Sequence, residues 1–92
     1  KMIKVRNMRS SRGNAVANQF IIEADDWEIF QSYGSVIAKK MYDGSGKTYI
    51  DENYWDYSRT TGKYRNDFLG ENRNITQMKI NSGEYILTDL NK

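Results

Sequence analysis

The chain of 92 residues carries 14 Lys and Arg against 12 Asp and Glu, a formal net charge of +2, and contains neither His nor Cys. Without imidazole and thiol groups, Ser-His and Cys-His nucleophiles and zinc sites built from thiolate and imidazole are excluded. The sequence also lacks disulfides and any apolar run of signal-peptide or membrane-spanning length, so we expect one cytoplasmic domain over residues 1–92.

The first half of the chain is predicted to form β-strands, because apolar and polar residues alternate in it. Polar or Gly-containing turns separate the predicted strands, which cover residues 2–8, 16–23, 27–33, 35–42 and 47–51. The clearest turn is Asp43-Gly44-Ser45-Gly46, whose glycines tolerate the backbone angles of a tight hairpin.

The second half is predicted to contain two short helices and a final strand. Thr60 or Thr61 can cap a helix over residues 62–69, with Gly70 ending it. Asn74 and Gln77 resemble a capping box that starts a second helix, which ends before Gly83. Residues 84–90 form a further strand, at the edge or in the centre of the sheet. We therefore expect an α+β fold: a mainly antiparallel sheet of five to six strands with two short helices packed on one face.

Two motifs with catalytic or cofactor associations are incomplete. Gly44-Ser45-Gly46-Lys47-Thr48 resembles part of a nucleotide-binding phosphate loop, but Met41 occupies the position where that loop needs its first Gly. The acids Asp51, Glu52 and Asp56 lack the alternating spacing of a calcium loop. We expect no cofactor, no metal and no catalytic residue, and a carboxylate-based hydrolase is the weakest hypothesis.

Residues 49–68 hold half of the aromatic residues of the chain, interleaved with Arg and Lys. Aromatic rings beside guanidinium groups suit stacking on unpaired bases, and Tyr, Trp and Arg are also enriched in protein interfaces. A small protein with few aliphatic residues must also use aromatic side chains for its core. Core, protein-binding and nucleic-acid-binding roles all remain open for this stretch.

Charges follow one another in blocks. Residues 1–12 contain no acid and include the bases Lys4, Arg6, Arg9 and Arg12, whereas residues 13–38 contain acids and no base. Such blocks pair across neighbouring strands or steer a charged partner. If the partner is a nucleic acid, these four bases are the candidate contacts.

Three segments together resemble a family of short uncharacterised proteins encoded by phages and other bacterial mobile elements: residues 30–38, 54–71 and 82–85. The resemblance covers most of the chain and is strongest between Tyr54 and Glu71. It implies a small accessory protein that binds and blocks host defence proteins, such as CRISPR nucleases or restriction enzymes. Inhibitors that imitate DNA are strongly acidic, whereas this chain is slightly basic.

The sequence thus favours a non-enzymatic protein that binds a bacterial host protein in the cytoplasm, plausibly inhibiting a defence nuclease in an anti-CRISPR-like or anti-restriction-like way. The candidate contact residues are Trp55, Tyr57, Arg59, Lys63 and Arg65. The alternative is a protein that binds nucleic acid directly through a basic and aromatic surface.

Overall fold

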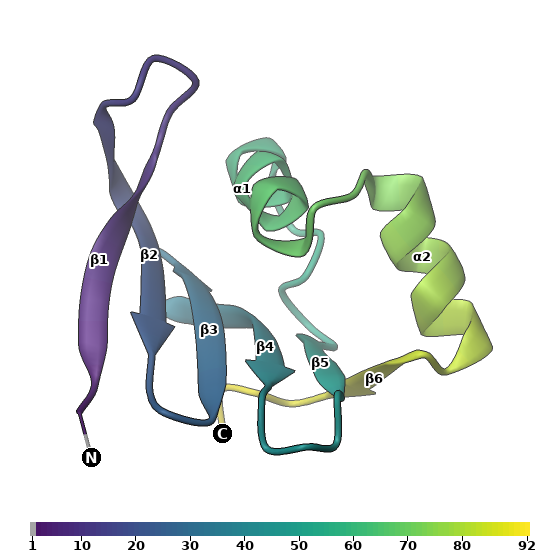
Figure 1. Ribbon diagram of the computed structural model, residues 1–92. Helices are drawn as coiled ribbons and strands as arrows, with labels where there is room; N and C mark the ends of the chain where they lie inside the picture. The colour runs from purple at the N-terminus through teal and green to yellow at the C-terminus, as the bar shows by residue number, and fades with distance from the viewer. Residues whose placement is uncertain (1) are drawn as a thin grey trace.

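Six strands form one sheet in the order in which they occur in the chain (Figure 1). The computed structural model describes residues 2–92, and its strands are β1 (Lys4–Arg9), β2 (Ala15–Glu23), β3 (Trp27–Ser32), β4 (Ser35–Met41), β5 (Thr48–Asp51) and β6 (Tyr85–Thr88). Strands β1 to β5 pair antiparallel with their neighbours, and β6 pairs parallel to β5 at the edge. The predicted α+β fold with a mainly antiparallel sheet is confirmed.

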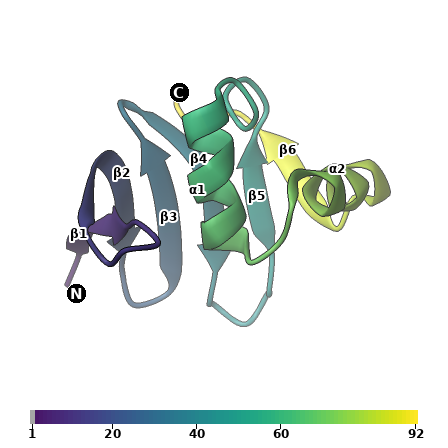
Figure 2. The same cartoon turned by 90° about the horizontal axis from the view of Figure 1, so that it is seen from above.

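The parallel pair β5–β6 needs a long crossover, because parallel strands cannot be joined by a tight turn. Helices α1 (Arg59–Leu69) and α2 (Arg73–Ser82) supply it. In Figure 2, α1 lies over the middle of the sheet and α2 lies beside β6. Gly70 ends α1 in the left-handed conformation, as predicted, and its N–H donates to the carbonyl of Asn66.

Both helices begin earlier in the chain than the sequence predicts. Ser58 caps α1 by accepting from the N–H of Thr61, so the predicted caps Thr60 and Thr61 are wrong. Thr61 is buried instead, and its hydroxyl lies 2.8 Å from that of Ser32 on β3. Asn72, not Asn74, caps α2 by accepting from the N–H of Ile75.

One face of the sheet carries the hydrophobic core. Residues paired across neighbouring strands share a face, and this rule places Ile21, Phe30, Ala38 and Ile50 in one continuous row. All four are buried, together with Tyr64 and Phe68 of α1. The rings of Phe30 and Phe68 lie 5.9 Å apart, so α1 packs directly on this row. We call this side of the sheet the helix-covered face.

Glu71 fastens α2 to β6 on the same side. One carboxylate oxygen accepts from the Lys79 ammonium and from the Tyr85 hydroxyl, each at 2.8 Å, and the other accepts from Thr76 at 2.6 Å. Burial raises the pKa of Glu71, but these three donors outweigh that effect and hold it below its usual value. Burial and the hydrogen bond to Glu71 raise the pKa of Tyr85 to about 12. The Glu71 carboxylate therefore links the helix junction to the sheet.

Candidate binding surface

The loop between β5 and α1 is fixed at its start by a buried carboxylate. Asp51, the last residue of β5, accepts hydrogen bonds from the N–H groups of Asn53 and Tyr54 through one oxygen. Its other oxygen accepts from the N–H of Leu90, beyond β6, at 2.8 Å. Asp51 is thus occupied by three backbone donors, and the loop leaves the sheet in a defined direction.

Arg65 holds the middle of this loop from α1. Its guanidinium donates to the carbonyl of Trp55 at 2.6 Å and to the Asp56 carboxylate at 3.1 Å, and it lies 5.1 Å from the centre of the Trp55 ring. Only 1% of the Arg65 side chain is exposed. A buried guanidinium can be retained only with such partners, because an unpaired charge in the interior is costly. Arg65 therefore positions the loop and does not reach the surface.

Asp56 joins this arrangement to α2. Its second oxygen accepts from Arg73 at 2.6 Å, and the Arg73 guanidinium lies 5.3 Å from the Trp55 ring. Burial raises the pKa of Asp56, but the hydrogen bonds and charges of Arg73 and Arg65 outweigh it and lower the pKa below its usual value. Trp55, Asp56, Arg65 and Arg73 form what we call the tryptophan clamp, which ties the loop to both helices.

Around the clamp, other side chains of the same stretch face solvent. Tyr57 is 46% exposed and Tyr54 is 39% exposed, and their rings meet edge to face at 5.4 Å. Arg59 and Lys63 are exposed one turn apart on α1. Within residues 2–92, neither of these bases has a carboxylate at ion-pair distance. Tyr54, Tyr57, Arg59 and Lys63 form what we call the aromatic–basic patch.

The position of Arg59 works against the stability of its own helix. It is the first residue of α1, and the first turn contains no acid. The N-terminus of a helix carries partial positive charge, so a base there is unfavourable and a carboxylate would be favourable. Arg59 instead adds to the positive potential at the end of the patch, which suits an anionic group on a partner.

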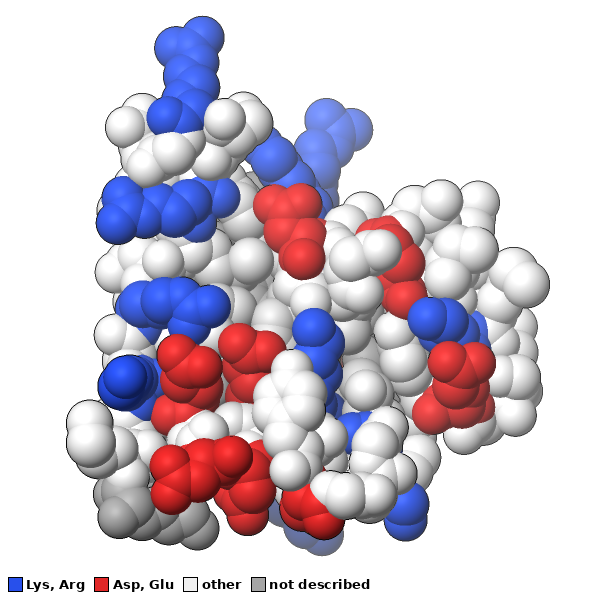
Figure 3. Space-filling view, viewed as in Figure 1, with Lys and Arg blue, Asp and Glu red and all other residues white. Residues whose placement is uncertain are grey.

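The four N-terminal bases lie on β1 and on the hairpin that joins it to β2. Figure 3 shows Lys and Arg side chains following this hairpin to its tip, more of them behind it over α1, and acids gathered toward the other end of these strands. Arg6 is neutralised by Glu23 at 3.1 Å and Glu28 at 3.8 Å. Arg9 donates to the carbonyl of Gly13. The side chains of Lys4, Arg9 and Arg12 are all exposed.

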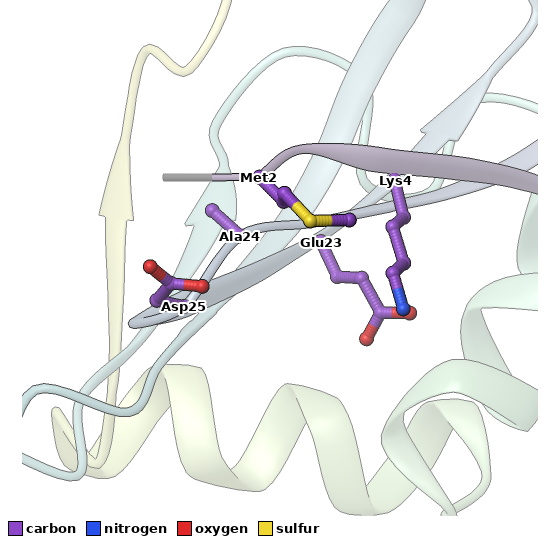
Figure 4. A pocket seen from close by; sticks show the side chains of 5 residues that line it. All are labelled: Met2, Lys4, Glu23, Ala24 and Asp25. Atoms are coloured by element: carbon purple, nitrogen blue, oxygen red, sulfur yellow. The ribbon is translucent and has the colours of Figure 1, made fainter.

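Two hollows lie beside β1. One, of about 280 Å³, separates β1 from α1 and is lined by Arg6, Asn7, Met8, Arg9, Ile21, Glu28, Asp67 and Phe68. The other is drawn in Figure 4 and is lined by Met2, Lys4, Glu23, Ala24 and Asp25. In it, Lys4 and Glu23 point to the same side, while Asp25 lies apart from them.

The structure thus separates the sequence-predicted contact residues into two groups. Tyr57, Arg59 and Lys63 are exposed in the patch, whereas Trp55 and Arg65 are engaged in the clamp. Two further residues of this surface were not among the sequence-predicted contacts. Arg73 completes the clamp from eight residues beyond Arg65, and Tyr54 pairs with Tyr57. Tyr54 and Tyr57 are three residues apart in a loop, and a loop has no regular period from which their contact could be predicted.

Two of the acids that could in principle bind a metal, Asp51 and Asp56, are each occupied by other partners. Asp51 is buried under three backbone donors, and Asp56 is bound by two guanidinium groups. Over residues 2–92, no group of three or more acidic side chains is placed to hold a metal ion. In the same part of the chain, neither helix has the length and apolar character needed to cross a bilayer.

Comparisons with known proteins give one match. No curated protein and no solved structure is significantly similar to the chain. Residues 3–84 match a family of unknown function, DUF8033, and they span strands β1 to β5, both helices and the candidate binding surface. Because this match covers most of the chain, the protein belongs to the DUF8033 family of unknown function.

Proposed function

We propose that the protein is a non-enzymatic accessory protein of a phage or bacterial mobile element that binds a host protein in the bacterial cytoplasm through its aromatic–basic patch. The observation that carries the proposal is the combination of exposed Tyr57 with Arg59 and Lys63, two bases with no carboxylate at ion-pair distance in residues 2–92. Tyr and Arg are the side chains that most often anchor protein interfaces. The clamp beneath supplies the rigidity that limits the entropy lost on binding.

The charge of the patch favours an acidic surface on the partner. Opposite charges across an interface accelerate association and select the orientation of the two proteins. A defence nuclease offers such a surface where carboxylates hold its catalytic Mg²⁺ ions. Bases that occupy those carboxylates would block the metal and the reaction together, and this is the form of inhibition that we propose.

Affinity capture from a bacterial host lysate, with and without nuclease treatment, tests the proposal. The wild-type chain should capture the same protein in both samples. Replacement of Arg59 and Lys63 by Ala should reduce capture at least tenfold, whereas replacement of the exposed bases Lys47 and Lys92, which lie outside the patch, should leave it unchanged. Equal capture by the patch variant and the wild type would refute the assignment of the patch.

Inhibition needs a direct measurement on the captured protein. If that protein is a nuclease, the wild-type chain should suppress its cleavage of DNA or RNA, and excess Mg²⁺ should weaken the suppression. If excess Mg²⁺ does not weaken the suppression, the chain still binds the nuclease but does not compete with Mg²⁺ for its carboxylates.

A second function, direct binding of nucleic acid, is favoured by the hairpin. Arg9 and Arg12 lie on it with no carboxylate at ion-pair distance in the described chain, and Arg9 also lines the hollow beside α1. Each phosphate neutralised by a base adds about one unit to the slope of log affinity against log salt. Replacing both residues by Ala should therefore lower that slope by about two units in an anisotropy titration with single-stranded and duplex oligonucleotides. No binding at low salt would exclude this function.

A further inference from the structure

The face of the sheet opposite the helices is apolar from one edge to the other. Backbone pairing places one residue of each strand in a continuous row, which runs Val5, Ile22, Ile29, Lys39, Tyr49 and Ile86. Each of the four central members directly follows or precedes a member of the buried core row, so the two rows point to opposite faces. We call this side the open face.

Further apolar side chains widen this row. Phe20 lies two residues from Ile22 along β2, and Trp27 pairs with Met41 on the same face. In Figures 1 and 2, both helices lie on the other side of the sheet. An antiparallel sheet with one solvated face normally carries polar residues there. Val5 is 63% exposed, and the other residues of the row and its flanks are partly exposed. A continuous apolar surface of this kind marks an interaction site.

We propose that a second copy of this chain covers the open face, so that the two sheets pack face to face in a symmetric dimer. The charge pattern supports a second copy because Lys39 is the only ionised side chain in the row. A two-fold interface brings identical patches together, and a nearly uncharged apolar patch is complementary to itself. A nucleic acid would need a basic surface, which this face lacks.

The size of the open face also fits a dimer. Six strands about 4.8 Å apart and about 20 Å long present roughly 600 Å² per copy, or about 1,200 Å² for both copies. The overall extents of the molecule, 35 × 34 × 24 Å, accommodate a face of these dimensions. This area lies at the lower limit for specific protein interfaces, so we expect a dimer that dissociates in the micromolar range.

Pairing through the sheet edge is a poorer route to a dimer. β1 forms one edge, and it carries Lys4, Arg6 and Arg9. An antiparallel partner made from a second β1 would bring these like charges together, which is destabilising. Bases on an edge strand commonly prevent such association. The open face is therefore a better surface for self-association than the β1 edge.

Lys39 sets the position of the two-fold axis. Its ammonium lies 5.4 Å from the centre of the Trp27 ring, on the open face. Two sheets centred on Lys39 would oppose two buried ammonium groups, which is costly. Centring the contact on Ile22 and Ile29 keeps the two Lys39 side chains apart, with their heads directed to solvent. The interface should therefore be built around β2 and β3.

Sedimentation equilibrium of the full chain over a range of concentrations tests the proposal. The wild type should shift from its monomer mass of 10.8 kDa toward twice that value as concentration rises. Ile29→Lys should abolish the shift, and Val5→Lys, at a side chain already 63% exposed and so harmless to the fold, should weaken dimerisation several-fold. Lys39→Met should tighten it, with the mass levelling off at that of a dimer, whereas misfolding would give larger aggregates.

Met78→Lys is the matched control, because Met78 is also 63% exposed but lies on α2, away from the open face. It should dimerise like the wild type. A wild type that remains monomeric at every concentration would overturn the proposal and leave the face to a different partner. A dimer that resists both Ile29→Lys and Val5→Lys would also overturn it, because another surface would then be responsible.

This inference is independent of the proposed function, because the patch and the open face involve different residues. A dimer would carry two patches and could bind a partner with two sites more tightly than one chain does. If the chain does not dimerise but still captures the host protein, only the dimer proposal fails.

Discussion

The inner and the outer sides of α1 carry the same kinds of residue and use them differently. On the inner side, Arg65 is buried and bound by the Trp55 carbonyl and the Asp56 carboxylate. On the outer side, Arg59 and Lys63 point to solvent. A base held by a carbonyl and a carboxylate inside the protein contributes to stability, whereas an exposed base with no carboxylate nearby is available for a partner. The comparison predicts opposite outcomes for substitutions on the two sides.

The largest effect is expected on the inner side, from Arg65→Ala. Removal of the guanidinium leaves the Asp56 carboxylate short of one partner and opens a space under Trp55. We expect a loss of about 3 kcal/mol in the free energy of unfolding, measured by urea denaturation. Lys63→Ala, two residues away on the outer side of the helix, should change it by less than about 0.5 kcal/mol. Similar losses for the two variants would remove the distinction between the sides.

Glu71 gives a second inner-side prediction, which depends on pH. Its pKa is lower in the folded protein than in the unfolded chain, so the folded protein gains stability above the unfolded value of about 4.3 and loses it as pH falls. Glu71→Gln should cost roughly 2 kcal/mol at neutral pH, because three donors lose a charged acceptor. As pH falls through the lowered pKa of folded Glu71, the two proteins should approach the same stability. A constant difference across the acid range would contradict the lowered pKa.

A smaller loss is expected at the boundary between the two sides, at Ser58. Its hydroxyl oxygen accepts from the N–H of Thr61 at 3.1 Å and caps the helix. Ser58→Ala should lower the free energy of unfolding by about 1 kcal/mol. Thr60→Ala is the control, since Thr60 is exposed and was a predicted cap that the structure does not use. A larger loss of stability from Thr60→Ala than from Ser58→Ala would show that Thr60 is the cap.

The smallest effect on stability, and one of opposite sign, is expected at Arg59. Arg59→Glu places a carboxylate at the positive end of α1 and should raise the free energy of unfolding by about 0.5 kcal/mol. The same change should abolish capture of the host protein, because it reverses the charge of the patch. A more stable protein that binds less well would show that Arg59 is kept at the expense of stability. Retained capture would separate Arg59 from binding.

Local patterns predicted the secondary structure well but not how distant residues combine. Alternation, apolar and aromatic content and the intervening turn residues together located the five N-terminal strands, and Gly70 ended α1 as expected. Several residues before Thr60 and Asn74 can cap a helix, so composition alone could not select Ser58 and Asn72. Nor could it place β6 parallel at the edge, because strand pairing depends on the path of the intervening helices.

The candidate site was only partly predictable for the same reason. The density of aromatic and basic residues singled out residues 49–68, and three of the five candidate contact residues in this stretch are exposed. The direction in which Trp55 and Arg65 point is set by Asp56 and by Arg73, a residue on the other helix. A three-segment contact of this kind leaves no periodic trace in the sequence.

The parallel pairing of β5 with β6 has a consequence for biosynthesis. β6 is the last of the six strands to leave the ribosome, and its place beside β5 can be filled only after both helices have been made. Until then the nascent chain presents β5 as a bare edge next to an apolar surface, a combination that promotes misassembly. Rapid synthesis of the final third of the chain, or protection by a chaperone, would shorten that vulnerable interval.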